Sequence, residues 1–143
     1  MSDIEFAKYF AERFWRFRKI EAQCVRGKSK DNHCHAAFVL LKDMELCFAA
    51  RAYYSCLLIS FTAIESCLNH ENVPGRNMHE KIQNSGYADE LDWLRVLRND
   101  IVHRGKVDHV IYDEEEQQLE EQCVKAFVLA HTIFHDPVKT PNQ

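Results

Sequence analysis

The chain has 143 residues, of which 46% are hydrophobic and 28% are charged, as expected for one domain that buries a hydrophobic core. It contains only four Gly and three Pro. An all-β fold of this length needs a turn about every ten residues, and such turns rely mostly on Gly, Pro, Asn and Asp. We therefore exclude a sandwich or barrel. The formal net charge of −4, taken alone, argues against a nucleic-acid partner.

The sequence contains no segment that predicts a membrane helix or a secretory signal. Its longest stretch without a charged side chain, residues 52–64, has thirteen residues, whereas a membrane-spanning helix needs about 20. The first ten residues carry acidic side chains in place of the basic cluster of a signal peptide. We expect a cytoplasmic protein without membrane contact. Its six cysteines are expected to be reduced, four of them as small apolar side chains within helices.

The first predicted helix begins at Ser2, because Ser2 and Glu5 have the spacing of a capping box. Four phenylalanines follow at intervals of four, four and three residues and form a stripe along one face: Phe6, Phe10, Phe14 and Phe17. We expect this stripe to lie in the core rather than to stack on nucleic-acid bases. The helix is predicted to end near Gly27.

Residues 31–71 contain neither Gly nor Pro, and the spacing of their apolar side chains predicts one long helix. Asp31 or Asn32 can cap its start. Apolar side chains lie on nearly every side, which is typical of a helix at the centre of a bundle or at an interface with a second subunit. A helix of about 40 residues would be roughly 60 Å long, so we predict a bend near Lys42 and Asp43.

Two more helices are predicted after the loop at residues 72–77, which contains both Pro and Gly. The first is short and runs from His79 to Asn84. The second runs from Ala88 to His103, and Gly105 is placed to act as its C-terminal cap.

The last predicted helix begins at Asp113 and ends at Pro137. A run of acidic residues at its start would stabilise it, because negative charges are favourable near the positive end of the helix dipole. Residues 1–137 are thus predicted to form one all-α domain, an up-and-down bundle of four or five helices. Residues 138–143 are expected to be a disordered tail.

One short motif, Arg98-Asn99-Asp100-Ile101-Val102-His103, carries the groups that RNA cleavage requires. Arg98 has a permanent positive charge and a planar set of donors suited to a phosphate. His103 titrates near neutral pH and precedes the predicted end of a helix, where the dipole favours the charged imidazole. Asn99 adds a neutral donor and acceptor. These groups suffice for attack by the ribose 2′-hydroxyl, so we expect neither a metal nor a cofactor.

The spacing of the motif creates a geometric difficulty. Residues five apart on an ideal helix are separated by about 140° of rotation, so Arg98 and His103 do not share a face. They could meet if the helix loosens before Gly105. They could also meet across a two-fold axis, with Arg98 of one subunit and His103 of the other lining one cleft.

The motif and its context resemble the HEPN superfamily (higher eukaryotes and prokaryotes nucleotide-binding). The hallmark of that superfamily is an Arg followed, after four to six residues, by a His. Here the gap is four residues, and Asn99 matches the polar residue that commonly follows the arginine. The helix layout extends the resemblance over most of the chain, and the stretch from Arg98 to His103 is its specific part.

The resemblance implies a metal-independent endoribonuclease that forms a homodimer and leaves a 2′,3′-cyclic phosphate and a 5′-hydroxyl. His103 would transfer protons, Arg98 would stabilise the pentavalent phosphate, and Asn99 would support orientation. The implied substrate is RNA. The implied setting is a toxin–antitoxin or phage-defence system, with an antitoxin or another operon product as a possible protein partner. Other members of the superfamily are inert, so the alternative is a nucleotide-binding, RNA-binding or protein-interaction module.

Neighbouring basic residues are candidates for contact with the RNA backbone, namely Arg95, Arg104 and Lys106. Their alternative role is that of solvated surface charges. Glu65 lies in an apolar stretch of an earlier helix, where it is either a paired core acid or a residue that orients Arg98.

Local structure alone offers another interpretation of the motif. Arg98 would then pair with Asp100 or a glutamate, and His103 would only cap its helix.

Metal binding is the main alternative chemistry. His33, Cys34 and His35 are possible ligands, and His131 and His135 lie four residues apart on one helical face. The chain contains no Cys-x-x-Cys pair and no Glu-x-x-His pair of the di-iron type. We therefore favour a metal-free site.

The net charge conceals a strong partition along the sequence. Residues 6–30 contain eight Lys or Arg and two Glu, and residues 95–106 contain four Lys or Arg and one Asp. Residues 108–122 contain seven acidic residues and no Lys or Arg. Because RNA responds to the local field, we predict that the basic surface borders the Arg98–His103 site and that the acidic helix face points away.

Overall fold

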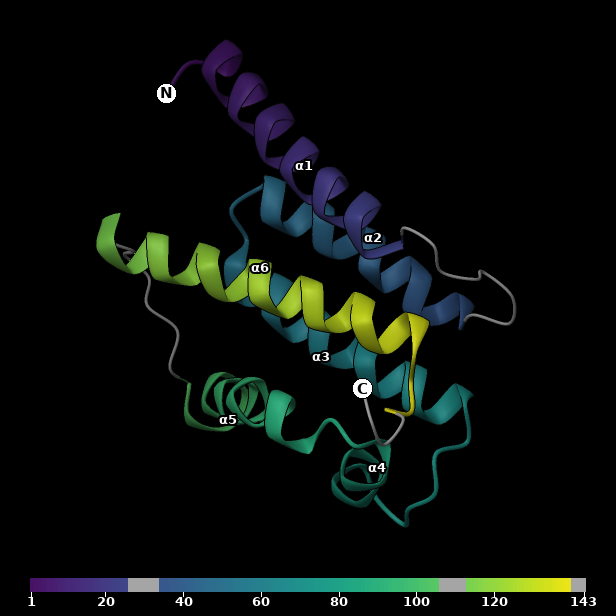
Figure 1. The fold of residues 1–143 in the computed structure, drawn as a ribbon. Coiled ribbons are helices and arrows are strands. Elements are labelled where there is room, and N and C mark those ends of the chain that lie inside the picture. The colour runs from purple at the N-terminus through teal and green to yellow at the C-terminus, as the bar shows by residue number, and fades with distance from the viewer. Residues whose placement is uncertain (26–33, 106–112, 140–143) are drawn as a thin grey trace.

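The computed structural model describes residues 1–25, 34–105 and 113–139, and in these ranges the chain is all-α, with six helices and no strand (Figure 1). The predicted class is therefore confirmed, although four or five helices were expected. The helices are α1 (Asp3–Val25), α2 (His35–Ala49), α3 (Tyr53–His70), α4 (Met78–Ser85), α5 (Ala88–Arg104) and α6 (Asp113–His135).

The number of helices differs because the segment 31–71, which was predicted as one long helix, forms two, so that prediction is wrong. The chain turns back at residues 50–52, and α2 and α3 pack side by side as a helical hairpin, with no break at Lys42 or Asp43 (Figure 1). Arg51 adopts a left-handed conformation, with φ at 62°, which is uncommon for a residue with a side chain. Its guanidinium pairs with Glu116 of α6, so a contact distant in sequence stabilises the turn.

The start of α2 also differs from the prediction. The N-terminal cap is Cys34 rather than Asp31 or Asn32, which lie outside the described residues. The Sγ atom of Cys34 accepts a hydrogen bond from the Ala37 N–H. The thiol also donates to the carbonyl of Ser66 and so ties the start of α2 to the far end of α3.

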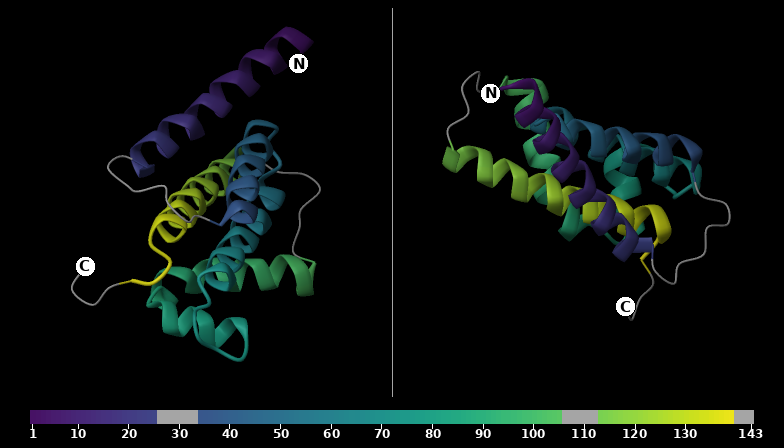
Figure 2. Two further views of the ribbon diagram at one scale, coloured as in Figure 1. Left: turned by 90° about the vertical axis from the view of Figure 1, so that its right-hand side faces the viewer. Right: turned by 90° about the horizontal axis from the view of Figure 1, so that it is seen from above.

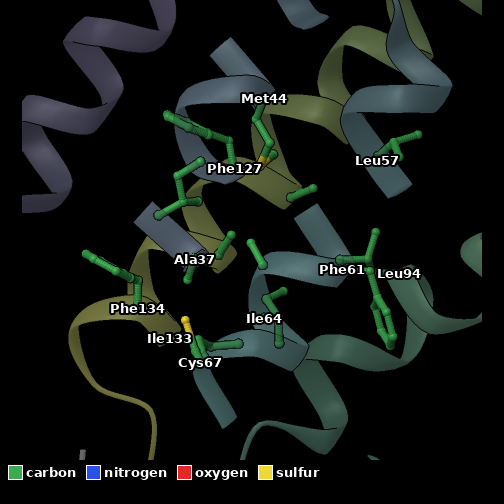
Figure 3. Close-up of a cluster of buried hydrophobic side chains, with 14 of the residues drawn as sticks. Ala37, Met44, Leu57, Phe61, Ile64, Cys67, Leu94, Phe127, Ile133 and Phe134 are labelled. Atoms are coloured by element: carbon green, nitrogen blue, oxygen red, sulfur yellow. The ribbon is translucent and has the colours of Figure 1, made fainter. Parts of the chain in front are cut away.

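Helix α3 lies at the centre of the bundle and packs against α2, α4, α5 and α6. This arrangement explains why its sequence is apolar on nearly every side. Figure 3 shows side chains of α3 meeting those of three neighbouring helices: Leu57, Phe61, Ile64 and Cys67 of α3, with Ala37 and Met44 of α2, Leu94 of α5, and Phe127 and Ile133 of α6.

Helix α1 begins with the predicted capping box, because the Ser2 and Glu5 side chains each bond to the other residue's backbone N–H. Only its second half joins the core. Phe17 is fully buried, and its ring stacks between Phe48 of α2 and Phe127 of α6 at centroid distances of 4.1 and 4.2 Å. Phe6 remains 51% exposed, so the prediction of a buried phenylalanine stripe is correct at Phe17 but wrong at Phe6.

Helices α4 and α5 match their predicted ranges to within one residue at each end. The corner between them is held by the segment that follows α6. The Tyr87 hydroxyl donates to the Asp136 carbonyl, and the Lys139 N–H donates to the Ser85 carbonyl. The predicted disorder of residues 138–143 therefore does not extend to Lys139, and residues 140–143 lie outside the described range.

All six cysteines are free thiols, and four of them are buried: Cys34, Cys56, Cys67 and Cys123. Within the described ranges, no helix has both the length and the hydropathy needed to span a bilayer.

Candidate active site at the end of helix α5

Helix α5 holds the predicted motif in a defined position. Leu91 and Leu94 are fully buried against the bundle, so they anchor the first half of the helix. Gly105 ends the helix as predicted, with φ at 62° and its N–H donating to the carbonyl of Asp100. A residue with a side chain would be strained at this φ, and the glycine therefore fixes where the helix stops.

Arg98 is half-buried and faces α3. Its Nη1 atom donates to the Asn99 side-chain oxygen at 3.3 Å, and its guanidinium carbon lies 5.4 Å from the centre of the Phe61 ring. Glu65 of α3 lies nearby, where burial raises the pKa of its carboxyl group and the positive charge of Arg98 opposes that rise. Among the described residues, Arg98 forms no ion pair within 4 Å, in contrast to the surface pairing considered above.

His103 lies near the end of the same helix but in different surroundings. Its side chain is exposed to solvent, and no hydrogen bond or ion pair joins it to Arg98. Because α5 remains α-helical through Arg104, the loosening considered before Gly105 does not occur. The two side chains stay about 140° apart around the helix. One chain therefore brings Arg98 and Asn99 together but leaves His103 on another face.

The other predicted RNA contacts are only partly described. Arg95 is half-buried and pairs with Asp92 one turn earlier, at 2.9 Å. Arg104 ends α5, but its side chain is not among the described groups, and Lys106 lies outside the described residues.

The predicted distribution of basic surface is wrong for the basic residues of α1. Helix α1 packs against α2 and α6 but not against α5 (Figures 1 and 2). Two of its arginines, Arg13 and Arg16, instead pair with Glu120 in the acidic first half of α6. The acidic and basic segments therefore neutralise each other in part, at a distance from the end of α5.

A polar network centred on Arg13 was not predicted from the sequence. Its Nε donates to the Phe48 carbonyl at 3.0 Å, its Nη2 donates to the Tyr53 hydroxyl at 2.8 Å, and its Nη1 pairs with Glu120. The Tyr53 hydroxyl lies 2.7 Å from a Glu116 carboxylate oxygen, and burial together with the two carboxylates raises the tyrosine pKa. The partners of Arg13 lie 35 to 107 residues away in sequence, so no local pattern could have indicated the network.

A second buried polar cluster joins α1, α2 and α6. Glu45 is only 1% exposed and faces Arg18 at 3.3 Å, while Lys42 bonds to Glu21 at 2.6 Å. Burial and the neighbouring Glu21 raise the pKa of Glu45 to about 7. Burial would also raise the pKa of Glu21, but hydrogen bonds from Glu45 and Lys42 lower it to about 2. The two carboxyl groups therefore share one proton below neutral pH.

His131 of α6 lies near this carboxyl pair and titrates in the opposite sense. It is 3% exposed, and burial lowers its pKa to about 4, although the charge of Glu21 opposes the shift. Between about pH 4 and 6.5, the unfolded chain protonates His131 and the folded protein does not, so this residue makes stability fall as the pH falls. The raised pKa of Glu45 makes stability rise as the pH falls from about 7 to 4.5.

These two opposing titrations lead to a test. In the wild type, they are expected nearly to cancel between pH 6.5 and 4.5. The Glu45→Gln variant should lose about 2 kcal/mol of unfolding free energy over that interval, relative to the wild type, because only His131 still titrates. The His131→Phe variant should instead gain about 2 kcal/mol. Urea unfolding at both pH values measures this, and equal pH dependence in all three proteins would refute the assignment.

The metal alternative gains no support from the geometry. Within the described ranges, no three His, Cys, Asp or Glu side chains are grouped so as to hold a metal ion. His131 and His135 lie on α6, with ring centres 6.1 Å apart, and Cys34 acts as a helix cap. His33 lies outside the described residues.

Comparison with known proteins gives no match: no family model, no curated protein and no solved structure corresponds to this chain.

Proposed function

We propose that the protein is a metal-independent endoribonuclease of the HEPN type, active as a two-fold dimer. One observation carries the proposal. The intact Arg98–His103 motif closes helix α5 with His103 exposed to solvent, while Arg98 forms no ion pair within the described part of the chain and is held by Asn99 and Phe61. A surface arginine with only a structural role is usually solvated or paired with an acid.

The proposed reaction uses these groups in distinct roles. The 2′-hydroxyl of a ribose attacks the adjacent phosphorus, and the bond from phosphorus to the 5′-oxygen of the next nucleotide breaks. His103 moves the proton between the attacking and leaving oxygens, because an imidazole has one nitrogen that accepts a proton and one that donates a proton. The Arg98 guanidinium stabilises the added negative charge on the pentavalent phosphate. Asn99 positions that guanidinium through its side-chain oxygen.

Two copies are required because the motif is not assembled within one chain. Arg98 and His103 point about 140° apart on α5, so a second α5 related by a two-fold axis would supply the missing partner to each. A toxin–antitoxin or phage-defence setting, with RNA as substrate and an operon product as inhibitor, fits such an activity in the cytoplasm.

The test is incubation with total RNA in EDTA. The wild type is expected to cleave RNA and to leave 2′,3′-cyclic phosphate ends, while His103→Ala should be at least about 100-fold slower, because general acid–base catalysis is lost. His79→Ala removes another exposed helical histidine, on α4, and serves as the matched control with unchanged activity. Circular dichroism checks the folding of both variants. Cleavage at the wild-type rate by a folded His103→Ala protein would refute the proposal.

The separation of Arg98 from His103 also favours a second candidate function. If the chain does not pair through α5, the same exposed residues would serve an inert module that binds RNA or a protein without cleaving it. Saturable binding of RNA by the wild type, without cleavage in EDTA, would support this module over the enzyme.

A further inference from the structure

The first half of helix α1 extends beyond the rest of the bundle (Figures 1 and 2). Helix α2 ends beside Arg13, whose Nε bonds to the carbonyl of Phe48 and whose guanidinium lies 4.4 Å from the Phe48 ring centre. Beyond that point α2 no longer lies beneath α1. Residues 3–12, almost three helical turns, therefore project from the bundle.

The projecting half carries an apolar stripe that continues the buried face of α1. Phe6 and Phe10 lie eleven and seven residues before Phe17, and these spacings place each of them within about 20° of Phe17 around the helix. Phe17 is completely buried, whereas Phe6 is 51% exposed and Phe10 is half-buried. Within the described ranges, the face that packs on α2 and α6 thus continues for two more turns with Phe6 half exposed, and α6 approaches this half of α1 only at a hollow that Tyr9 shares with Gln117.

An uncovered helical segment of this length requires an explanation. Isolated helices shorter than about 12–15 residues are marginally stable in water. Exposed aromatic side chains in a row are also uncommon on a monomer surface, where they mark contact sites. On the same helix, Tyr9 and Ile4 are 53% and 82% exposed.

We infer that a second copy of this chain covers the stripe, with the two α1 helices antiparallel across a two-fold axis near Phe10. The stripe is symmetric about that residue, because the Phe10 ring centre lies 6.3 Å from that of Phe6 and 6.4 Å from that of Phe14. An antiparallel pair therefore sets Phe6 of each copy against Phe14 of the other. This self-complementarity is what an isologous interface requires and what an unrelated partner would not need.

The charges of α1 are also arranged for pairing with a copy of itself. The first turn is acidic, with Asp3 and Glu5, and the turn at Arg16 and Arg18 is basic, although these two arginines also pair with Glu120 and Glu45 of their own chain. Antiparallel pairing about Phe10 brings the acidic turn of each copy alongside the basic turn of the other. It also opposes the two helix dipoles, which is the favourable arrangement.

The interface extends the proposed function. The interface itself does not depend on that function, but the role of the dimer in catalysis does. In the left view of Figure 2 the projecting half of α1 and the C-terminal end of α5 both point to the right, with α1 above the bundle and α5 below it. A partner that binds at α1 therefore approaches the side on which α5 ends.

The experiment measures oligomeric state and cleavage separately. The wild type is expected to be a dimer by light scattering and sedimentation, and the Phe6→Glu/Phe10→Glu protein a monomer at the same concentration. Phe38→Glu, at a 45% exposed phenylalanine of α2, is the matched control and should remain dimeric. A monomeric wild type, or a dimeric double variant, would overturn the inference. A monomeric double variant that still cleaves RNA would support the interface and refute the dimeric active site.

A second measurement does not depend on how the double variant folds. Phe10→Cys places a thiol next to the proposed two-fold axis, so mild oxidation is expected to give a disulfide-linked dimer on a non-reducing gel. Wild type and Phe38→Cys, treated in parallel, account for the native cysteines and for random collision. Cross-linking of Phe10→Cys no greater than that of Phe38→Cys would overturn the inference.

Discussion

An equimolar mixture of His103→Ala and Arg98→Ala proteins is expected to cleave RNA, although neither protein does so alone. If each active site takes Arg98 from one subunit and His103 from the other, a mixed dimer contains one intact site and one that lacks both residues. Random exchange makes half of the dimers mixed, so the mixture should recover about a quarter of the wild-type activity. Cleavage rates in EDTA, measured after the subunits have exchanged, give the result.

The matched control replaces Arg98→Ala in the mixture by the double variant Arg98→Ala/His103→Ala. That protein forms the same mixed dimers but supplies no His103, so no activity should return. If the first mixture stays inactive although mass spectrometry of differently labelled subunits shows exchange, the site is not shared between subunits. If Arg98→Ala alone cleaves RNA at the wild-type rate, Arg98 is not part of the site.

Replacing Phe17 by alanine is expected to cost about 3–5 kcal/mol of unfolding free energy. The Phe17 ring fills the space between α1, α2 and α6, with stacked partners at 4.1 and 4.2 Å on its two sides. Removing it leaves a cavity and separates three helices that otherwise meet at this ring. Urea unfolding followed by circular dichroism measures the loss as a lower transition midpoint.

The control for this experiment is Phe38→Ala, which removes the same side chain from an exposed position on α2. Its ring contacts the Lys42 amine at 5.2 Å, and its loss should cost no more than about 1 kcal/mol. Equal destabilisation by the two variants would show that Phe17 does not anchor α1 to the bundle.

The elements that the sequence predicts well are those defined by neighbouring residues. Helix α5 has apolar spacing of three and four residues and a glycine at its end, and both signals lie within the helix itself. The turn at Arg51 has no such signal, because its left-handed conformation is stabilised by Glu116, 65 residues later. A contact of this kind overrides local helix propensity and is invisible to patterns of period 3.6.

The candidate site also combines features that neighbouring residues determine with features that depend on contacts distant in sequence. Spacing alone shows that Arg98 and His103 cannot share a face, and the structure keeps them apart on one α-helix. The surroundings of Arg98 depend on tertiary packing, because Phe61 and Glu65 belong to another helix. The Arg13 network and the Glu21–Glu45 pair join segments distant in sequence, so only the folded arrangement reveals them.

The ring stack at Phe17 also determines when helix α1 can complete its packing during synthesis. Phe48 leaves the ribosome soon after Phe17. Phe127 does not follow until 110 residues after Phe17, a delay of about 5–20 s at ordinary translation rates. The α2–α3 hairpin has short-range contacts and can form in that time. Until Phe127 is made, the side of the Phe17 ring on which it packs stays uncovered. Helix α1 is made before the helices on which it packs, but it is therefore among the last to complete its packing, and its aromatic face is available to chaperones in the meantime.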